Sequence, residues 1–81
     1  MKISVVLFAA AKDIVGQPKI EIEVCDKGTV NDAKQSLAKI YPNLAPLLDN
    51  SAMAIGNEYC RMDQTLRDGD ELACIPPVSG G

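Results

Sequence analysis

The residues of this chain that are best suited to take part in a reaction are the last seven, Ile75-Pro76-Pro77-Val78-Ser79-Gly80-Gly81. Glycine has no Cβ, so Gly80 and Gly81 can pass through a slot too narrow for a side chain. The α-carboxyl group of Gly81 has a reference pKa of roughly 3.3–3.7, so it is ionised at neutral pH. A carboxylate is a poor electrophile, but a second enzyme that activates it with ATP would turn Gly81 into an acyl donor.

The two prolines before this tip set how the tail leaves the folded part of the chain. Pro76 and Pro77 carry no backbone N–H and hold φ near −65°, so sheet pairing should stop there and the chain should continue extended. We therefore predict a folded domain over residues 1–75 and an extended tail over residues 76–81. The alternative is a frayed terminus without a function, which is common at chain ends.

The rest of the composition offers little for catalysis by this chain alone. There is no histidine, so Ser-His and Cys-His arrangements for nucleophilic catalysis are absent. The three cysteines, Cys25, Cys60 and Cys74, form no C-x-x-C pair, and a zinc site would need all three thiolates plus a carboxylate. We predict no metal site and interpret the cysteines as reduced thiols that act as small hydrophobic residues on strands.

Charge and hydropathy narrow the class of partner. The chain has 8 Lys and Arg against 11 Asp and Glu, a net charge of −3, and no basic stripe, so no nucleic-acid partner is expected. No apolar run approaches the roughly 18–20 residues that span a membrane, and the first residues lack the pattern of a signal peptide. We expect a cytoplasmic protein whose partners present basic docking surfaces.

Alternating apolar and polar residues predict five strands and one main helix. In the helix Thr29 is the expected N-cap, and Asp32 three residues later comes close to a capping box, in which Glu or Gln is the better partner. Pro42 forces an end near Ile40. Apolar residues at helical spacing predict a buried stripe on this helix made of Val30, Ala33, Leu37 and Ile40. The predicted strands cover residues 2–8, 19–25, 51–55, 58–60 and 71–75. Residues 9–15 are expected to form a short helical or irregular turn, and residues 44–48 a short helical turn.

The order of these elements predicts the fold class. Two hairpins flank one helix, which favours an α+β chain with the β-grasp (ubiquitin-like) arrangement, a mixed sheet of four to five strands packed on one main helix. In this arrangement the first and last strands lie side by side and parallel at the centre of the sheet. A ferredoxin-like fold is the alternative, but it requires a second helix of similar length, which the pattern does not contain.

Two segments give the chain a resemblance to a known family. The run Asp68-Gly69-Asp70-Glu71-Leu72-Ala73, followed by Pro76-Pro77-Val78-Ser79-Gly80-Gly81, resembles the small subunit of molybdopterin synthase. The opening Leu7-Phe8-Ala9 and the stretch Lys12-Asp13-Ile14-Val15-Gly16 also resemble it, and the similarity extends over the whole chain. Members of that family are sulfur carriers with a β-grasp fold.

The resemblance implies a carrier that catalyses nothing itself. An adenylating enzyme similar to ubiquitin-activating enzymes would use ATP to adenylate Gly81, and a sulfur donor would displace AMP to leave a thiocarboxylate. The tail residues Gly80, Ser79, Val78, Pro77 and Pro76 would enter the large synthase subunit, which holds the active site. There the sulfur would pass to a cyclic pterin precursor in molybdenum cofactor biosynthesis. No cofactor is expected on this chain.

A carrier must also be recognised by its partners, which favours an exposed apolar patch with polar groups at its rim. Strand alternation gives Leu7 and Cys74 to the helix side of the sheet, so we expect Phe8, Tyr59 and Ile75 on the other side. Lys12 and Arg61 are the predicted charged contacts at the rim. The alternative is that Phe8 and Ile75 pack in the core.

Other functions can end in the same two glycines. A thiamine-type sulfur carrier has a similar fold and tail but typically lacks the Pro-Pro pair. Ubiquitin-like protein modifiers usually have a basic residue in the tail, where this chain has Ser79. A third possibility is an interaction module whose tail has no chemical role.

Overall fold

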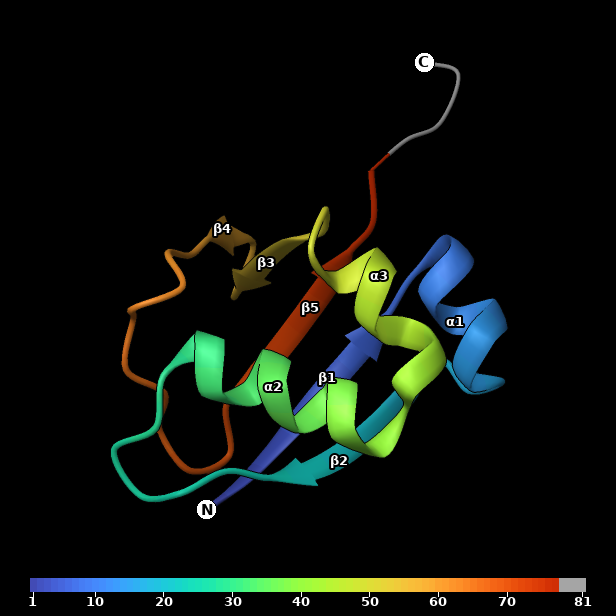
Figure 1. The fold of residues 1–81 in the computed structure, drawn as a ribbon. Coiled ribbons are helices and arrows are strands. Elements are labelled where there is room, and N and C mark those ends of the chain that lie inside the picture. Colours follow the sequence, from blue (N-terminus) through green and yellow to red (C-terminus); the bar gives the residue numbers. More distant parts are fainter. Residues whose placement is uncertain (78–81) are drawn as a thin grey trace.

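The computed structural model describes residues 1–77, and its elements follow the order predicted from the sequence (Figure 1). The strands are β1 (Lys2–Leu7), β2 (Lys19–Glu23), β3 (Ala52–Ile55), β4 (Glu58–Tyr59) and β5 (Glu71–Ile75). The helices are α1 (Ala9–Val15), α2 (Val30–Ile40) and α3 (Ala45–Leu48), and the 3₁₀ turn η1 (Pro42–Leu44) leads from α2 into α3.

The strands form one mixed sheet in the order β2-β1-β5-β3-β4. β1 and β5 pair in parallel at its centre, with Val5 opposite Leu72 and Leu7 opposite Cys74, and the other neighbours are antiparallel. The predicted β-grasp arrangement is therefore confirmed. Within residues 1–77, α2 is the only helix longer than two turns, which excludes the ferredoxin-like alternative.

The main helix begins where the sequence predicts, at a complete capping box. The Asp32 backbone N–H donates to Thr29 Oγ1 at 3.3 Å, and the Thr29 backbone N–H donates to Asp32 Oδ2 at 2.8 Å. These bonds satisfy donors that the first turn of a helix would otherwise leave free, and the Asp32 carboxylate also lies at the positive end of the helix dipole.

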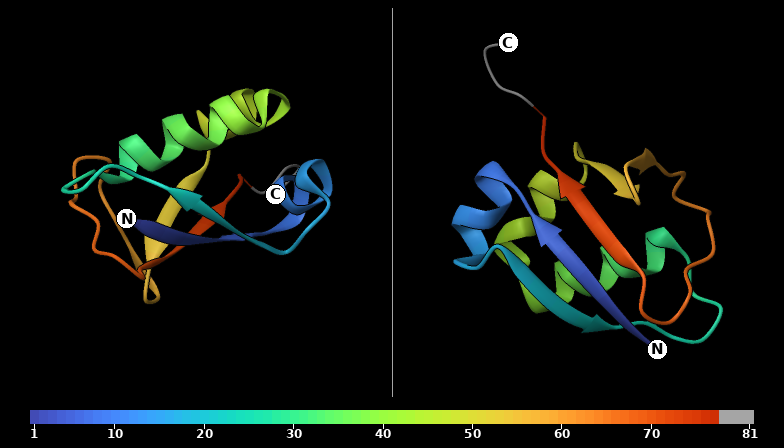
Figure 2. Two further views of the ribbon diagram at one scale, coloured as in Figure 1. Left: turned by 90° about the horizontal axis from the view of Figure 1, so that it is seen from below. Right: turned by 180° about the vertical axis from the view of Figure 1, so that it is seen from behind.

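One face of the sheet is covered, and the core lies there. Figure 2 shows α2 lying across one side of the strands, with the opposite side free of helices within residues 1–77. Val30, Ala33 and Leu37 of α2 are buried as predicted, but Ile40 is 54% exposed, so its place in the buried stripe was wrong. Ile40 is the last residue of α2, and Tyr41 follows it as the C-cap. At this end Tyr41 packs against the core instead.

Several strands are shorter in the structure than predicted, and three of the end residues that they leave out have a local reason. Phe8 lies outside β1 because it is the N-cap residue of α1 and its carbonyl accepts the Ala11 N–H. Cys25 lies outside β2 because its carbonyl accepts the Gly28 N–H, which closes a turn. Ser51 precedes β3 because its hydroxyl donates to the Leu47 carbonyl at the end of α3. Cys60 follows β4.

The prediction for the cysteines was only partly right. Cys25, Cys60 and Cys74 are all free thiols, and Cys74 is a buried strand residue in the core. Cys25 is exposed and Cys60 is half-buried, and neither belongs to a strand. The predicted strand ran on to Cys25, whereas β2 ends at Glu23 and Cys25 belongs to the turn closed at Gly28.

The β3–β4 hairpin is formed by the reversal that the sequence predicted at Gly56-Asn57. Gly56 has φ 57° and Asn57 has φ 69°. Two successive positive φ angles are typical of the tight hairpin turns that favour glycine and asparagine.

None of the helices within residues 1–77 has the length and apolar character required to cross a membrane.

Candidate functional site

A groove lies on the face of the sheet opposite α2, which we call the open face. Strand pairing places one residue from each strand in a single row across this face, because Val6 pairs with both Lys19 and Ala73, and Ala54 pairs with both Ala73 and Tyr59. The row is therefore Lys19, Val6, Ala73, Ala54 and Tyr59. The two alanines occupy its middle, and their small side chains leave the hollow.

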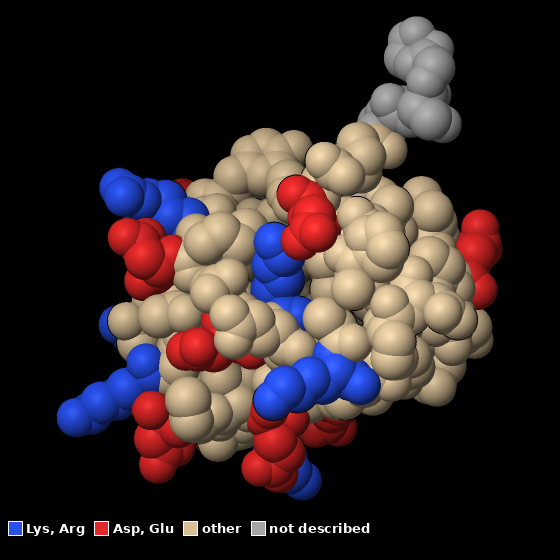
Figure 3. Space-filling view, in the orientation of Figure 1, with Lys and Arg blue, Asp and Glu red and all other residues tan. Residues whose placement is uncertain are grey.

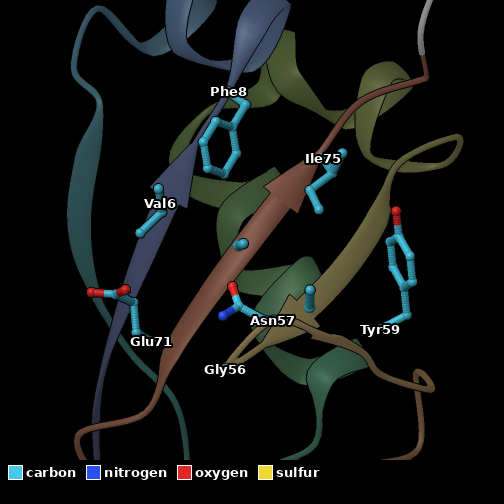
Figure 4. A pocket seen from close by; sticks show the side chains of 9 residues that line it. Val6, Phe8, Gly56, Asn57, Tyr59, Glu71 and Ile75 are labelled. Carbon is cyan, nitrogen blue, oxygen red and sulfur yellow. The ribbon is translucent and has the colours of Figure 1, made fainter.

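Larger side chains form the walls of this groove (Figure 4). Phe8 follows β1 and is 47% exposed, Tyr59 of β4 is 76% exposed, and Ile75 of β5 is half-buried. The groove has a volume of about 360 Å³. Its nine lining residues are Val6, Phe8, Ala54, Gly56, Asn57, Tyr59, Glu71, Ala73 and Ile75. The prediction that Phe8, Tyr59 and Ile75 lie together on the open face is confirmed, and the core alternative for Phe8 and Ile75 is wrong.

A charged pair lies at one end of this otherwise apolar surface. Lys19 Nζ is 2.9 Å from Glu71 Oε2, with both side chains more than half exposed. An exposed pair of this kind contributes little to stability, at most about 1 kcal/mol. Its effect is to give the groove a polar end opposite Phe8 and Ile75, as Figure 4 shows for Glu71. Sequence analysis missed Glu71, although alternation places it on the same face as Ala73 and Ile75.

The two predicted rim residues do not line the groove. Lys12 is exposed on α1. Arg61 follows β4, and its Nε is 3.3 Å from Asp63 Oδ1 in an exposed local ion pair. α1 carries Lys12 and the segment after β4 carries Arg61, and neither part of the chain lines the groove.

The chain leaves the sheet beside the groove. β5 ends at Ile75, which is paired with Ala52, and the prolines end the strand pairing as predicted. Pro76 is buried and Pro77 is exposed. The predicted tail residues Val78, Ser79, Gly80 and Gly81 lie outside the described residues.

The described side chains offer a binding surface rather than a reactive centre. Burial raises the pKa of the Cys74 thiol, and a hydrogen bond with Ser51 opposes this only in part. Burial also raises the pKa of the Cys60 thiol. Both thiols are therefore protonated at neutral pH, and a protonated thiol is a weak nucleophile. Within residues 1–77, no three His, Cys, Asp or Glu residues are grouped closely enough to hold a metal ion.

The helix-bearing face has no patch of a single charge. Figure 3 shows lysine and arginine side chains interspersed with aspartate and glutamate there, beside a largely uncharged region. Lys34 Nζ of α2, for example, lies 3.3 Å from Asp49 Oδ1 after α3.

These features define the class of protein: a ubiquitin-like β-grasp domain with an apolar groove on its open face and a chain that leaves β5 beside that groove. The ThiS family model matches residues 5–81, so the chain belongs to the ThiS family. The match covers the central strand pair, the main helix and the C-terminal residues.

Relatives and solved structures agree with this assignment. The chain is 38% identical over 80 residues to the molybdopterin synthase sulfur carrier subunit of Dictyostelium discoideum, covering 95% of this chain and 93% of the relative. It is 33% identical to small archaeal modifier protein 3 of Haloferax volcanii, covering 100% of both chains. The crystal structure of SAMP1 from Haloferax volcanii superposes with a TM-score of 0.89 at 28% identity, covering 100% of both chains.

Proposed function

We propose that this chain is the sulfur carrier subunit of a molybdopterin synthase. The observation that carries the proposal is the 38% identity, over nearly the full length of both chains, to the Dictyostelium protein of that name. In this role the chain is a carrier, and the active site lies on the large subunit. The free thiols of Cys25, Cys60 and Cys74 agree with a reducing compartment such as the cytoplasm.

The proposed chemistry takes place at the carboxylate of Gly81. A carboxylate oxygen attacks the α-phosphorus of ATP on an adenylating enzyme, and pyrophosphate leaves. Sulfide (HS⁻) delivered by a sulfur donor then attacks the acyl carbon of this adenylate. The C–S bond forms as the bond to AMP breaks, and loss of the S–H proton leaves a thiocarboxylate on Gly81. The large subunit transfers that sulfur to a cyclic pterin precursor, and two such transfers supply the two sulfurs of the dithiolene.

The open-face groove supports a role in docking for this carrier. Phe8 and Tyr59 are exposed aromatic residues, a type that is enriched at protein interfaces, and Ile75 continues the apolar wall to the end of β5. A partner that covers the groove is therefore held next to the point where the chain leaves the sheet. In the proposal, both the adenylating enzyme and the large subunit use this surface, while contacts from Lys12 and Arg61 remain a prediction.

Intact-mass measurement tests the proposal. After incubation with the adenylating enzyme, ATP and a sulfur donor, the chain should gain the mass difference of one oxygen-to-sulfur exchange, located at Gly81 by fragmentation. Omission of ATP is the matched control, because without adenylation the carboxylate does not react. An unchanged mass in the complete reaction would contradict the proposal. Transfer of the sulfur to a cyclic pterin separates this role from that of a thiamine-type carrier.

A second candidate function is attachment to other proteins as a modifier. The similarity to small archaeal modifier protein 3 favours it, because that relative is 33% identical over the full length of both chains. Residues 68–81 contain no lysine or arginine, so trypsin would leave all of them attached to a target lysine after cleavage at Arg67. We expect no such remnant in digests of cell lysate. Its detection on lysines of other proteins would establish the modifier role.

A further inference from the structure

The two prolines at the end of β5 differ in their surroundings. Alternation along β5 places Leu72 and Cys74 on the helix side, where both are fully buried. Pro76 continues this alternation and is also buried, whereas Pro77 is exposed. Terminal segments are usually poorly ordered unless they pack against the fold. The burial of Pro76 therefore indicates that the first residue after β5 is held in place.

The end of β5 is held from several sides. Ile75 pairs with Ala52 of β3, and α1 contacts β5. Ser51, which directly precedes β3, is fixed by its bond to the Leu47 carbonyl at 2.7 Å. Figure 1 shows the chain leaving between α1 and the connection from α3 to β3. Pro76 is therefore buried at a point where the neighbouring backbone has little freedom.

The backbone stays conformationally restricted from the end of β5 as far as Pro77. Ile75 is fixed as a strand residue and is also confined to extended angles by the proline that follows it. The ring fixes φ of Pro76 near −65°, and Pro77 in turn confines ψ of Pro76 to the extended range. Pro77 again has a fixed φ. Every backbone torsion up to the Cα of Pro77 is thus confined, and the pair forms an arm of about 6 Å at about 3.1 Å per residue.

We propose that Pro76 is a positioning residue that sets the direction in which the C-terminal residues leave the sheet relative to the groove. Burial fixes the ring of Pro76 against the fold, and the torsions of the pair pass that direction on to Pro77. This inference rests on the proposed function, since a fixed direction matters only if Gly81 must reach an active site while the groove is docked. Exposed Pro77 stiffens the arm but does not anchor it.

Kinetics of loading separate this role from simple stabilisation. Replacing either proline frees that residue and relaxes the residue before it, at a cost of about two- to fivefold. Pro76→Gly in addition removes the buried ring that anchors the arm. We expect Pro76→Gly to lower kcat for thiocarboxylate formation about tenfold, with KM unchanged because the groove is intact. Pro77→Gly, the matched control, should lower kcat by less than about fivefold, since Pro76 remains anchored. A purely structural role would lower the melting temperature and leave kcat of the folded protein unchanged.

A second measurement does not depend on loading. In the unaltered chain, the residual dipolar coupling of the Pro77 Cα–Hα bond should fit the alignment tensor of the β-sheet. The fit should be poorer in a Pro76→Ala variant, and the coupling should fall towards zero in Pro76→Gly. Couplings that do not fit the sheet tensor in the unaltered chain would overturn the inference, as would equal kcat values for all variants or a change in KM alone. Failure of the unaltered chain to be loaded would count against the proposed function, while the couplings would still decide the role of Pro76.

Discussion

Deletion of Gly81 is expected to abolish sulfur loading while the domain stays folded. The deletion moves the terminal carboxylate back by one residue, a distance of about 3.3–3.6 Å along an extended chain. Since a misplacement of 1 Å can cost about 100-fold in rate, the loss should exceed the range of the assay. Intact-mass analysis of the deletion variant in the complete reaction should therefore show no sulfur.

Two controls make this result specific. The core is formed by residues between Ile3 and Cys74, so the deletion should leave the midpoint of urea unfolding unchanged. Addition of one alanine after Gly81 moves the carboxylate by a similar distance in the other direction and should be equally inactive. Sulfur uptake by either variant would mean that Gly81 is not the acceptor, and a large fall in the unfolding midpoint would mean that the C-terminal residue supports the fold.

The second large effect is expected when the groove is filled. Ala73 lies in the middle of the groove floor between Val6 and Ala54, and its side chain faces away from the core. Ala73→Arg would place a long cationic side chain where a partner must pack, next to surfaces that we expect to be basic. Removal of a central contact at an interface commonly costs 2 kcal/mol or more. We expect binding of the adenylating enzyme, measured by calorimetric titration, to weaken by at least about 30-fold.

Gln17→Arg provides the matched control for this substitution. It makes the same change in charge at an exposed position outside the groove. Its dissociation constant should stay within about twofold of the unaltered value, as is usual for substitutions away from the contacts that dominate an interface. Equal weakening by both substitutions would indicate a general charge effect, and normal binding by Ala73→Arg would place the interface elsewhere.

Much of the fold could be predicted because its signals are local. The period-two pattern of Lys19–Glu23, the capping box at Thr29 and Asp32, and the turn at Gly56-Asn57 each depend on a few neighbouring residues. Their order was enough to indicate the parallel pairing of β1 with β5. The exposure of Ile40 could not be predicted from helical spacing, because burial at the end of a helix depends on tertiary packing, and here Tyr41 packs against the core.

The walls of the groove could be predicted from the sequence, but its floor could not. Large apolar residues assigned to the open face pointed to Phe8, Tyr59 and Ile75. The floor depends on two alanines, Ala54 and Ala73, which are distant in sequence and meet only through the register of β3 with β5. Alanine is common in every kind of structural element, so neither residue indicates a groove in the sequence. In the structure the small side chains of these two residues form the floor of the groove.

The position of β5 also has a consequence for how the carrier is made. Within residues 1–77, β5 is the last strand to be synthesised, yet it lies between β1 and β3 and supplies one half of the central pair. A nascent chain therefore lacks the middle of its sheet until β5 has been made, and the pairing of β5 with β1 is a slow, long-range step. A prematurely terminated chain that stops before β5 would be left without a stable fold and open to degradation. The fold is thereby tied to synthesis of β5, the strand that directly precedes the C-terminal residues.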